Sequence, residues 1–437
     1  MKPEKITTDP QIDMFKIELN RLVNSRHPMV KLAKQINWPE FDKEFDTHYS
    51  EEGRPAIPTR LMVSLHYLKY SFDLSDEATV ANWVENPYWQ YLSGNQYFEY
   101  AMPIDPSSMT RWRQRIGDKG AETLLSRTIV TGIEQGYLKR AQCERVSVDT
   151  TAQTKAIRFP TDARLYDRMR LTLAKSAESA GIELRQNYTR VGKRILHRQQ
   201  NYAHAKQFNR AKRETKRLKT LLGRVIRDIE RKAVNPSDIL KEQLALAQQL
   251  MLQERDSKNK IYSIHEPQVE CIAKGKMHQR YEFGCKVGFV VSAKGNWILG
   301  AQAFPGNPYD GHTIQKSLEH AEHLTETKIK LALCDLGHRG HSVTSTVVSI
   351  VPRLKNKASR MIRRWWKRRN AIEPIIGHQK SDHRLNRNQL AGELGDKLNV
   401  IFSASGFNFR KLLRAFWLWL QYAFNCVFPV NFQRTFS

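Results

Sequence analysis

Three carboxylates, Asp149, Asp335 and Glu373, have the types and settings that metal-dependent phosphoryl transfer requires. Asp149 and Asp335 each come at the end of a short apolar segment, and Glu373 lies in one of the most basic stretches of the chain. Carboxylate oxygens are hard ligands that suit Mg²⁺ or Mn²⁺. Three carboxylates in one crevice repel one another unless cations bind there. Two such ions could activate a water or a 3′-hydroxyl, so no covalent nucleophile is needed.

Each acid also has a simpler explanation. Glu373 could be a surface charge partner within a basic helix, and Asp149 could cap a turn. Asp310 and His312 are polar loop residues that could either approach an active site or serve as ordinary turn residues. Glu373 is surrounded by cations: Arg363, Arg364, Lys367, Arg368, Arg369 and Lys380.

A zinc site is a weaker alternative. The five cysteines are scattered and never form a CxxC pair, which argues against a zinc ribbon and a disulfide framework and fits a reducing cytoplasm. We expect the cysteines to be small buried residues. The histidines that follow the acids could contact phosphate, stay structural or, for His338 and His378, assist proton transfer. They are His312, His338, His341, His378 and His383.

Apolar segments indicate the sheet that must position the acids. Strand-like sequence occurs at 145–153, where Asp149 is expected near the strand end, and at 268–274, 281–292, 297–304 and 347–351. Asp335 follows the apolar segment at 328–334. Acids at strand ends in an α/β sheet project into the ligand crevice. The turn at 294–296 predicts a hairpin between the third and fourth of these strands.

A basic helical segment interrupts the sheet at about 160–259. Residues 185–232 contain 16 Lys and Arg against 3 Asp and Glu, with leucines and isoleucines at helical spacing on one face. This density of like charge destabilises a helix unless an anion neutralises it. The segment is either a solvated helical hairpin or, as we favour, a clamp on the DNA backbone. We expect Arg213, Lys216 and Arg217 to contact DNA.

The N-terminal part, residues 1–140, is predicted to be a helical DNA-binding domain. A helix over 60–70, a second capped by Ser75, and a third capped by Ser107 or Ser108 resemble a helix-turn-helix arrangement. The third helix carries Arg111, Arg113 and Arg115, which are expected to contact DNA unless they are merely solvated. Another helix is expected over 121–136.

Composition indicates a globular protein with a polyanionic partner. The 437 residues are 40% hydrophobic, and 71 Lys and Arg against 44 Asp and Glu give a formal net charge of +27. We expect no secretory signal, because the N-terminal residues lack an apolar run. The aromatic run at 415–429 is too short to cross a bilayer and predicts a buried terminal helix rather than a membrane span.

The chain resembles bacterial insertion-sequence transposases of the DDE class, and most closely the group named after insertion sequence five. The resemblance covers most of the chain. It rests on Gly53-Arg-Pro55, Val148-Asp149-Thr150, the segments at 274–276, 281–284 and 306–310, and Asp335-Leu-Gly-His-Arg-Gly340. It implies an RNase H-like catalytic core, a mixed sheet flanked by helices that the helical segment interrupts.

The most specific part is the spacing around the third acid. These transposases carry Tyr-x2-Arg-x3-Glu-x6-Lys, and here Arg369, Glu373 and Lys380 match in type and spacing, with Trp366 at the tyrosine position. The resemblance implies that Glu373 is a metal ligand and that Arg369 and Lys380 contact terminal DNA phosphates. Trp366 keeps an aromatic face that could stack on a base but lacks the phenol hydroxyl.

These expectations define one function and two alternatives. The resemblance implies an α/β enzyme that binds element ends, cleaves DNA with two Mg²⁺ or Mn²⁺ ions held by Asp149, Asp335 and Glu373, and joins the freed 3′-hydroxyls to target DNA. Its partners would be double-stranded terminal inverted repeats and target DNA, held by a homodimer at the bacterial nucleoid. The alternatives are a metal-dependent nuclease of the same fold without strand transfer, and a basic DNA-binding protein without catalysis. The expected domains are 1–140, a catalytic domain at 141–403, and a C-terminal aromatic helix at 404–437 that packs on the core.

Overall fold

The computed structural model describes residues 2, 15–50, 52, 55–254, 256–273, 280–351 and 359–427, with side chains up to residue 415. It divides into two compact units, one formed by residues 1–154 and 285–437 and the other by residues 155–284. Parts of the resemblance lie outside the described residues, namely positions 53–54 and 274–276. The aromatic side chains expected to bury the C-terminal helix lie outside them as well.

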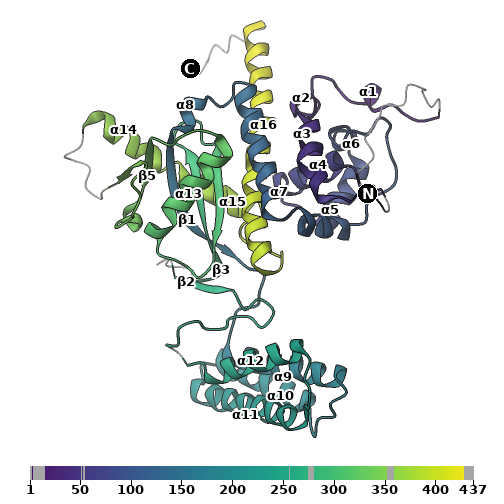
Figure 1. The fold of residues 1–437 in the computed structure, drawn as a ribbon, viewed down its shortest axis with the longest axis vertical. Coiled ribbons are helices and arrows are strands. Elements are labelled where there is room, and N and C mark those ends of the chain that lie inside the picture. The colour runs from purple at the N-terminus through teal and green to yellow at the C-terminus, as the bar shows by residue number, and fades with distance from the viewer. Residues whose placement is uncertain are drawn as a thin grey trace, which may run out of the picture. The chain divides into compact units, whose positions relative to one another are not determined.

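A six-stranded mixed sheet forms the centre of the larger unit, with strand order β2-β3-β1-β5-β6 and β4 paired to β3 (Figure 1). β5 is parallel to both β1 and β6, whereas β2 and β4 run antiparallel to β3. β2 and the first residues of β3 belong to the smaller unit. The strands are β1 (Arg145–Thr154), β2 (Glu270–Ala273), β3 (Tyr281–Ser292), β4 (Ile298–Phe304), β5 (Leu331–Cys334) and β6 (Val347–Ile350).

The strands form where apolar residues recur, as the sequence predicted. The predicted hairpin between β3 and β4 is confirmed, with Gly295 and Asn296 at φ 93° and 57° in the turn. Both angles are in the left-handed region that glycine and asparagine tolerate, which is why this pair closes a tight hairpin. Val287 and Phe289 on β3 are fully buried, so this strand forms part of the hydrophobic core.

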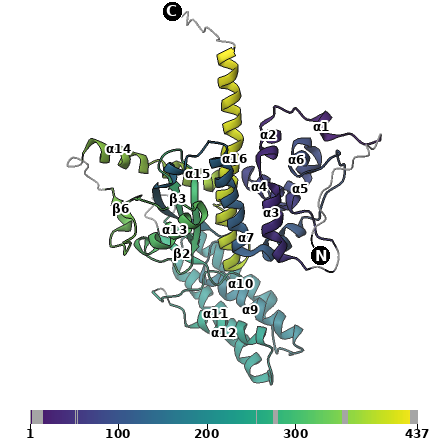
Figure 2. The same cartoon turned by 45° about the horizontal axis from the view of Figure 1, so that its top comes forward.

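The sheet and the surrounding helices share one hydrophobic core. The long helix α16 (Gly392–Val427) packs against β4 on the sheet and against α4 and α7, and its contact with α7 is visible in both views (Figures 1 and 2). Leu398 and Phe402 of α16 join the same cluster of buried residues as Val146 of β1. Within the described residues, no helix combines the length and apolar content needed to cross a membrane.

The N-terminal helices begin close to the predicted positions. The helix expected over 60–70 is α4, and Ser75 caps α5 by accepting a hydrogen bond from the backbone N–H of Ala78, as predicted. The predicted caps Ser107 and Ser108 are wrong, because α7 begins at Ser107 and Asp105 accepts the Ser107 N–H instead. The helix expected over 121–136 is the second half of α7, which bends at Gly117. The elements are α1 (Leu19–Leu22), α2 (Pro28–Gln35), α3 (Trp38–Phe45), η1 (Asp46–His48), α4 (Thr59–Ser71), α5 (Asp76–Glu85), α6 (Pro87–Leu92), α7 (Ser107–Glu134) and α8 (Arg140–Cys143).

The smaller unit is a helical bundle with its own core, and the predicted helical segment at about 160–259 falls within it. Leu218, Leu222 and Ile229 on α11 pack with Met169 and Leu173 on α9, because the apolar residues of both helices recur at helical spacing. Most lysines and arginines of α11 are left on the opposite, exposed face, whereas the acids Glu214 and Asp228 are buried. The helices are α9 (Asp162–Ser179), α10 (Thr189–His204), α11 (Phe208–Lys232) and α12 (Asp238–Leu252).

The close approach of α16 to α4 generates a stability prediction. An ideal Cβ on Gly406 would lie 2.6 Å from the backbone carbonyl carbon of Tyr70, so Gly406→Ala must push two helices apart. We expect it to lower the free energy of unfolding by about 1–3 kcal/mol, measured from the midpoint of urea unfolding followed by circular dichroism. The control is Gly377→Ala on a helix with open space around the position, where the change should be stabilising by about 0.5–1 kcal/mol. Equal midpoints for the two variants would contradict the packing argument.

Candidate active site

The parallel pairing of β1 and β5 brings the first two acids together. Arg145, Val146 and Ser147 are in register with Leu331, Ala332 and Leu333, and the same register two residues further places Asp149 opposite Asp335. The sequence prediction that Asp149 ends its strand is wrong, since β1 continues to Thr154. Asp335 does follow β5 directly, as predicted. The two acids are therefore neighbours although 185 residues lie between them in the sequence.

The third acid reaches the same place from a pair of helices. α14 (Arg360–Arg369) begins after Ser359, whose hydroxyl accepts the N–H of Ile362, and α15 (Ile372–Asp382) follows after a short turn. Arg369 ends α14 and Glu373 lies in the first turn of α15, four residues later. Packing of α14 and α15 against β1 brings this turn to the two aspartates.

The guanidinium of Arg369 joins all three acids. Its Nη2 lies 2.9 Å from Asp149 Oδ2 and 3.4 Å from Asp335 Oδ2, and its Nη1 lies 2.7 Å from Glu373 Oε1. Arg369 is only 8% exposed, so these contacts are shielded from solvent on the arginine side. The structure thus brings the three predicted acids together around one cation. One positive charge among three carboxylates leaves a formal negative excess at this point.

A buried histidine holds Asp335 from behind. His338, fully buried, lies with Nδ1 2.6 Å from Asp335 Oδ1, and the N–H of Gly337 donates to the same oxygen. The hydrogen bond from His338 lowers the pKa of the Asp335 carboxyl below its usual value, while partial burial works in the opposite direction. Asp335 is therefore ionised at neutral pH and presents its other oxygen to Arg369. His338 serves as a support for the acid and lies too deep to contact a DNA phosphate.

A fourth carboxylate, Asp310, lies next to this cluster. It begins α13 (Asp310–Thr325), and its Oδ1 accepts hydrogen bonds from Thr150 Oγ1 at 2.8 Å and Lys286 Nζ at 2.9 Å. An ideal Cβ on Gly337 would lie 3.3 Å from Asp310 Oδ2 and 3.2 Å from Asp335 Oδ1, so both acids border this glycine. The sequence allowed two interpretations of Asp310, as a residue of the active site or as an ordinary turn residue. Thr150 follows Asp149 directly in the sequence, and its hydroxyl donates to Asp310, so Thr150 connects the strand of Asp149 to the start of α13.

Lysine 286 was not singled out by the sequence. It lies on β3, is largely buried, and also donates to the carbonyl of Pro308. A lysine in the middle of a largely apolar strand is an available signal, since a buried ammonium needs a carboxylate partner. Lys286 fixes the loop before α13 and balances the charge of Asp310.

No group of three or more His, Cys, Asp or Glu residues in the described ranges has the arrangement of a metal site. The three acids are arranged around a guanidinium, which separates their oxygens. The histidines considered for zinc are dispersed: His378 pairs with Asp382, and buried His383 contacts the Tyr70 carbonyl, with its pKa lowered to about 4 chiefly by burial. Of the candidate histidines, His338 contacts Asp335, whereas His378 and His383 form these hydrogen bonds elsewhere.

The remaining residues of the spaced motif flank the cluster. Trp366 is half-buried and its indole N–H donates to Ser349 Oγ at 3.1 Å, on the turn of helix that precedes Arg369. Lys380 is partly exposed in the last turn of α15. Arg369 was expected to contact DNA phosphates, but in the structure its guanidinium points at the three acids and not at solvent.

Comparison with known proteins adds a family relationship. Residues 17–115 match a family model described as "Transposase domain (DUF772)". A Rhizobium meliloti protein named "Uncharacterized protein ORF8 in nfe locus" is 48% identical over 208 residues, which are 48% of this chain and the whole of that protein. The chain belongs to the same family as that protein. The domain match makes it transposase-like and indicates a function related to transposition. No solved structure matches.

Within the transposase domain, the three candidate arginines have different settings. Arg111 and Arg115 on α7 are exposed, although Arg115 also lies 5.0 Å from the ring centre of Tyr49. Arg113 is 3% exposed and donates to both oxygens of Asp76, at 2.9 and 2.6 Å. A buried guanidinium in a bidentate pair cannot reach DNA, so Arg113 is removed from the predicted DNA contacts. Successive odd positions of a helix point in different directions, which is why one of the three faces the core.

The buried pair is part of a larger polar cluster. Lys69 Nζ lies 2.7 Å from Asp76 Oδ1, on the same carboxylate. Burial works against ionisation of Asp76, but the hydrogen bonds and charges of Arg113 and Lys69 outweigh it and hold its pKa far below the usual value. Asp76 therefore contributes its full stabilisation above its ordinary pKa, and this stabilisation is lost progressively as the pH falls from that value through the depressed pKa of the folded state.

In the helical insertion, the predicted residues Arg213, Lys216 and Arg217 are all exposed on α11. Arg217 pairs with Glu214 at 3.2 Å, so part of its charge is balanced within the helix. The exposed position of all three residues is compatible with a contact to a polyanion.

The difference between Arg113 and its neighbours gives a prediction. Arg113→Met should lower the free energy of unfolding by about 3–5 kcal/mol, since Asp76 would lose its bidentate partner inside the protein. Arg111→Met removes an exposed charge and should change stability by less than about 0.5 kcal/mol. The measurement is the urea unfolding midpoint of both variants. Similar stability of the two variants would show that the buried pair does not carry this energy.

Proposed function

We propose that this chain is a DDE-class transposase of the group named after insertion sequence five. The observation that supports the proposal most is the convergence of Asp149, Asp335 and Glu373 on one guanidinium, with one oxygen of each carboxylate within 3.4 Å of it. These residues come from two adjacent strands and a helix far apart in the sequence. Three carboxylates so close together lower the stability of the fold, because like charges in a half-buried site repel. Such a cluster is therefore more typical of a functional site than of a structural one.

The sheet supports an RNase H-like catalytic core. An antiparallel hairpin, β3 and β4, is joined through β1 to the parallel strands β5 and β6. The helical segment enters between β1 and β2, so the sheet is interrupted without loss of the β1–β5 pairing that holds the acids. The N-terminal helices with the transposase domain would supply DNA binding, with Arg111 and Arg115 as the exposed cations of α7.

The donor set fits hard divalent ions. Asp149, Asp335 and Glu373 offer only oxygen ligands and carry more negative charge than Arg369 neutralises. Mg²⁺ or Mn²⁺, as a pair when bound, would supply activation of a water or 3′-hydroxyl and stabilisation of the leaving oxygen. His338 keeps Asp335 ionised and oriented for this role. Asp310 is close enough to contribute to the charge of the site.

Arg369 has two roles in this proposal. In the structure it balances the three carboxylates, and it would compete with any ions held by the same oxygens of Asp149, Asp335 and Glu373. A displaced guanidinium carries its full charge and a planar donor set suited to phosphate, so it can then bind the DNA backbone. The exchange explains why an arginine whose family role is to contact DNA lies against the acids. Lys380 and Trp366 would complete the contacts to the terminal nucleotides.

The partners follow from the reaction. Terminal inverted repeats and target DNA would be double-stranded substrates, and a homodimer would hold two element ends together in the bacterial cytoplasm. A nuclease of the same fold would cleave these ends without joining them. Incubation of the protein with element ends and a target plasmid separates the two, because only a transposase yields joined product.

Catalysis by the three acids is tested on individual variants. We expect Asp149→Asn, Asp335→Asn and Glu373→Gln each to reduce Mg²⁺-dependent nicking by about 10²–10³-fold or more, the size of effect seen when one group that stabilises a transition state is removed. Glu319→Gln, an exposed acid on α13, is the control and should nick at the wild-type rate. Nicking that persists in all three site variants would overturn the assignment, and a basic DNA-binding protein without catalysis would then be the better description.

Displacement of Arg369 is tested by metal binding rather than by activity. We expect Arg369→Gln to bind Mn²⁺ on the order of tenfold more tightly than the wild type by isothermal titration, because no guanidinium competes for the oxygens; tenfold corresponds to about 1.4 kcal/mol. The variant should also melt at a lower temperature without divalent ions, since three carboxylates lose their counter-charge. Arg369→Lys, which keeps the charge, should lie between the two. Weaker Mn²⁺ binding by Arg369→Gln would contradict the exchange.

A further inference from the structure

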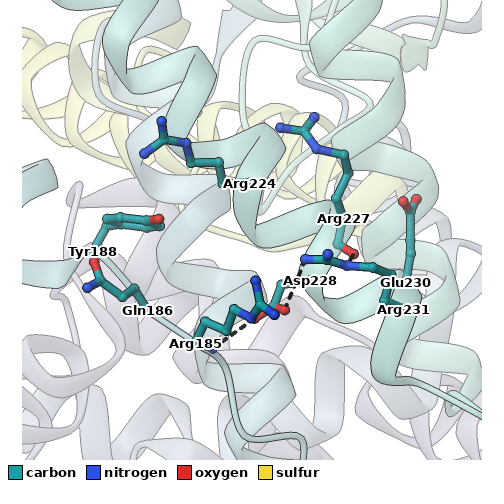
Figure 3. A pocket seen from close by; sticks show the side chains of 8 residues that line it. All are labelled: Arg185, Gln186, Tyr188, Arg224, Arg227, Asp228, Glu230 and Arg231. Carbon is teal, nitrogen blue, oxygen red and sulfur yellow. Dashed lines mark hydrogen bonds and ion pairs between the residues drawn. The ribbon is translucent and has the colours of Figure 1, made fainter.

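A second basic site lies in the helical unit, away from the three acids in the sequence. A hollow of about 460 Å³ is formed by one face of α11 and by the loop that joins α9 to α10. Figure 3 shows its side chains, with Arg224 and Arg227 extending from the helix and Tyr188 on the side of the loop. Its lining residues are Arg185, Gln186, Tyr188, Arg224, Arg227, Asp228, Glu230 and Arg231.

The loop is held in place by buried charged groups. Asp228, 5% exposed, accepts the backbone N–H of Arg185 at 2.8 Å, and this hydrogen bond is the main cause of its lowered pKa. On the other side of the loop, fully buried Arg170 donates to the carbonyl of Asn187 and pairs with Asp167 at 2.7 Å. The walls of the hollow are therefore fixed by contacts to two helices. Such preorganisation lowers the entropic cost of binding a ligand.

The arginines on α11 have little local compensation. Arg224, Arg227 and Arg231 lie on one helical face by their spacing, and all are exposed. Arg231 lies 3.4 Å from Asp228, but within the described ranges neither Arg224 nor Arg227 forms an ion pair with a carboxylate. The acid nearest in sequence, Asp228, is already engaged by the loop. The face thus carries uncompensated guanidinium groups, which an anion would stabilise.

We propose that this hollow binds the phosphodiester backbone of duplex DNA, as a docking site separate in the chain from the catalytic residues. The inference rests on the proposed function for the identity of the polyanion. From Arg224 to Arg231 the helix rises about 10 Å, at roughly 1.5 Å per residue. That span exceeds a single phosphate and suits consecutive phosphates along a strand. Guanidinium groups bind phosphate oxygens in a bidentate manner and read no base sequence.

The salt dependence of DNA binding measures the contact directly. Each lost phosphate contact reduces the slope of log K against log salt concentration by about 0.9. We expect Arg224→Gln/Arg227→Gln in the full-length chain to reduce the slope by about 2, measured by fluorescence anisotropy with a random-sequence duplex from 50 to 200 mM KCl. The same reduction is expected with an element-end duplex, because backbone contacts do not depend on sequence.

A matched control separates a docking site from net charge. Lys175→Gln/Lys241→Gln removes two exposed charges from α9 and α12 of the same unit, outside the hollow, and should leave the slope unchanged. Arg224→Lys/Arg227→Lys keeps the charge and should restore most of the slope. Equal reductions of the salt slope in the two double glutamine variants would show that only net charge matters. An unchanged slope in Arg224→Gln/Arg227→Gln would exclude the site.

Failure of this site and failure of the proposed function have different signatures. The function fails if the wild-type chain does not nick element ends with Mg²⁺, whatever its salt slope. The docking site fails if the slope is insensitive to Arg224 and Arg227 while nicking by the wild type is present. Inorganic phosphate adds a third observation: phosphate that binds the wild type at millimolar concentration without lowering its affinity for DNA, beyond the effect of ionic strength, would show a small-anion site and overturn the duplex proposal.

Discussion

The site of this protein depends on one electrostatic constraint, the balance of three carboxylates by a single guanidinium. Asp149, Asp335 and Glu373 can lie together only if their repulsion is compensated, and Arg369 compensates it at distances of 2.7–3.4 Å. The compensation is incomplete, since three negative charges face one positive charge. A site built in this way is stable enough to fold and still attracts cations. Full compensation by two further arginines would have made a structural salt-bridge cluster with little attraction for a divalent ion.

This constraint explains the arrangement of the surrounding elements. The parallel β1–β5 register places two acids side by side, and the turn between α14 and α15 adds Glu373 and Arg369 together, four residues apart. His338 and Gly337 direct Asp335 through hydrogen bonds to one oxygen, which leaves the other oxygen for a cation. The two aspartates and the counter-charge of Arg369 are therefore positioned by different parts of the chain.

The sequence was sufficient where a single segment determines the outcome. The strands, the hairpin at Gly295 and the cap at Ser75 follow from local patterns of apolar and turn residues. The approach of the three acids was instead expected from the strand ends and from what the resemblance implies. It was insufficient where a distant partner decides. Arg113 looked like its exposed neighbours, and only Asp76 on another helix shows that it is buried. Asp149 was placed at a strand end because polar residues follow it, yet Thr151 and Gln153 are buried and the strand continues. Polarity alone does not end a strand whose polar residues find partners, as Gln153 does with Asp396.

The same reasoning applies to the charge of the whole chain. A net charge of +27 predicts a polyanion partner, but it does not tell which cations contact it. Arg113, Arg170 and Arg369 are buried and paired with carboxylates, so they stabilise the fold or the site. Arg224 and Arg227 are exposed, and charges of this second kind can gain a new partner without first breaking an ion pair with a carboxylate. The capacity to bind DNA therefore depends on the exposed subset rather than on the total, and two chains of equal net charge can differ widely in affinity if their arginines are divided differently between the core and the surface.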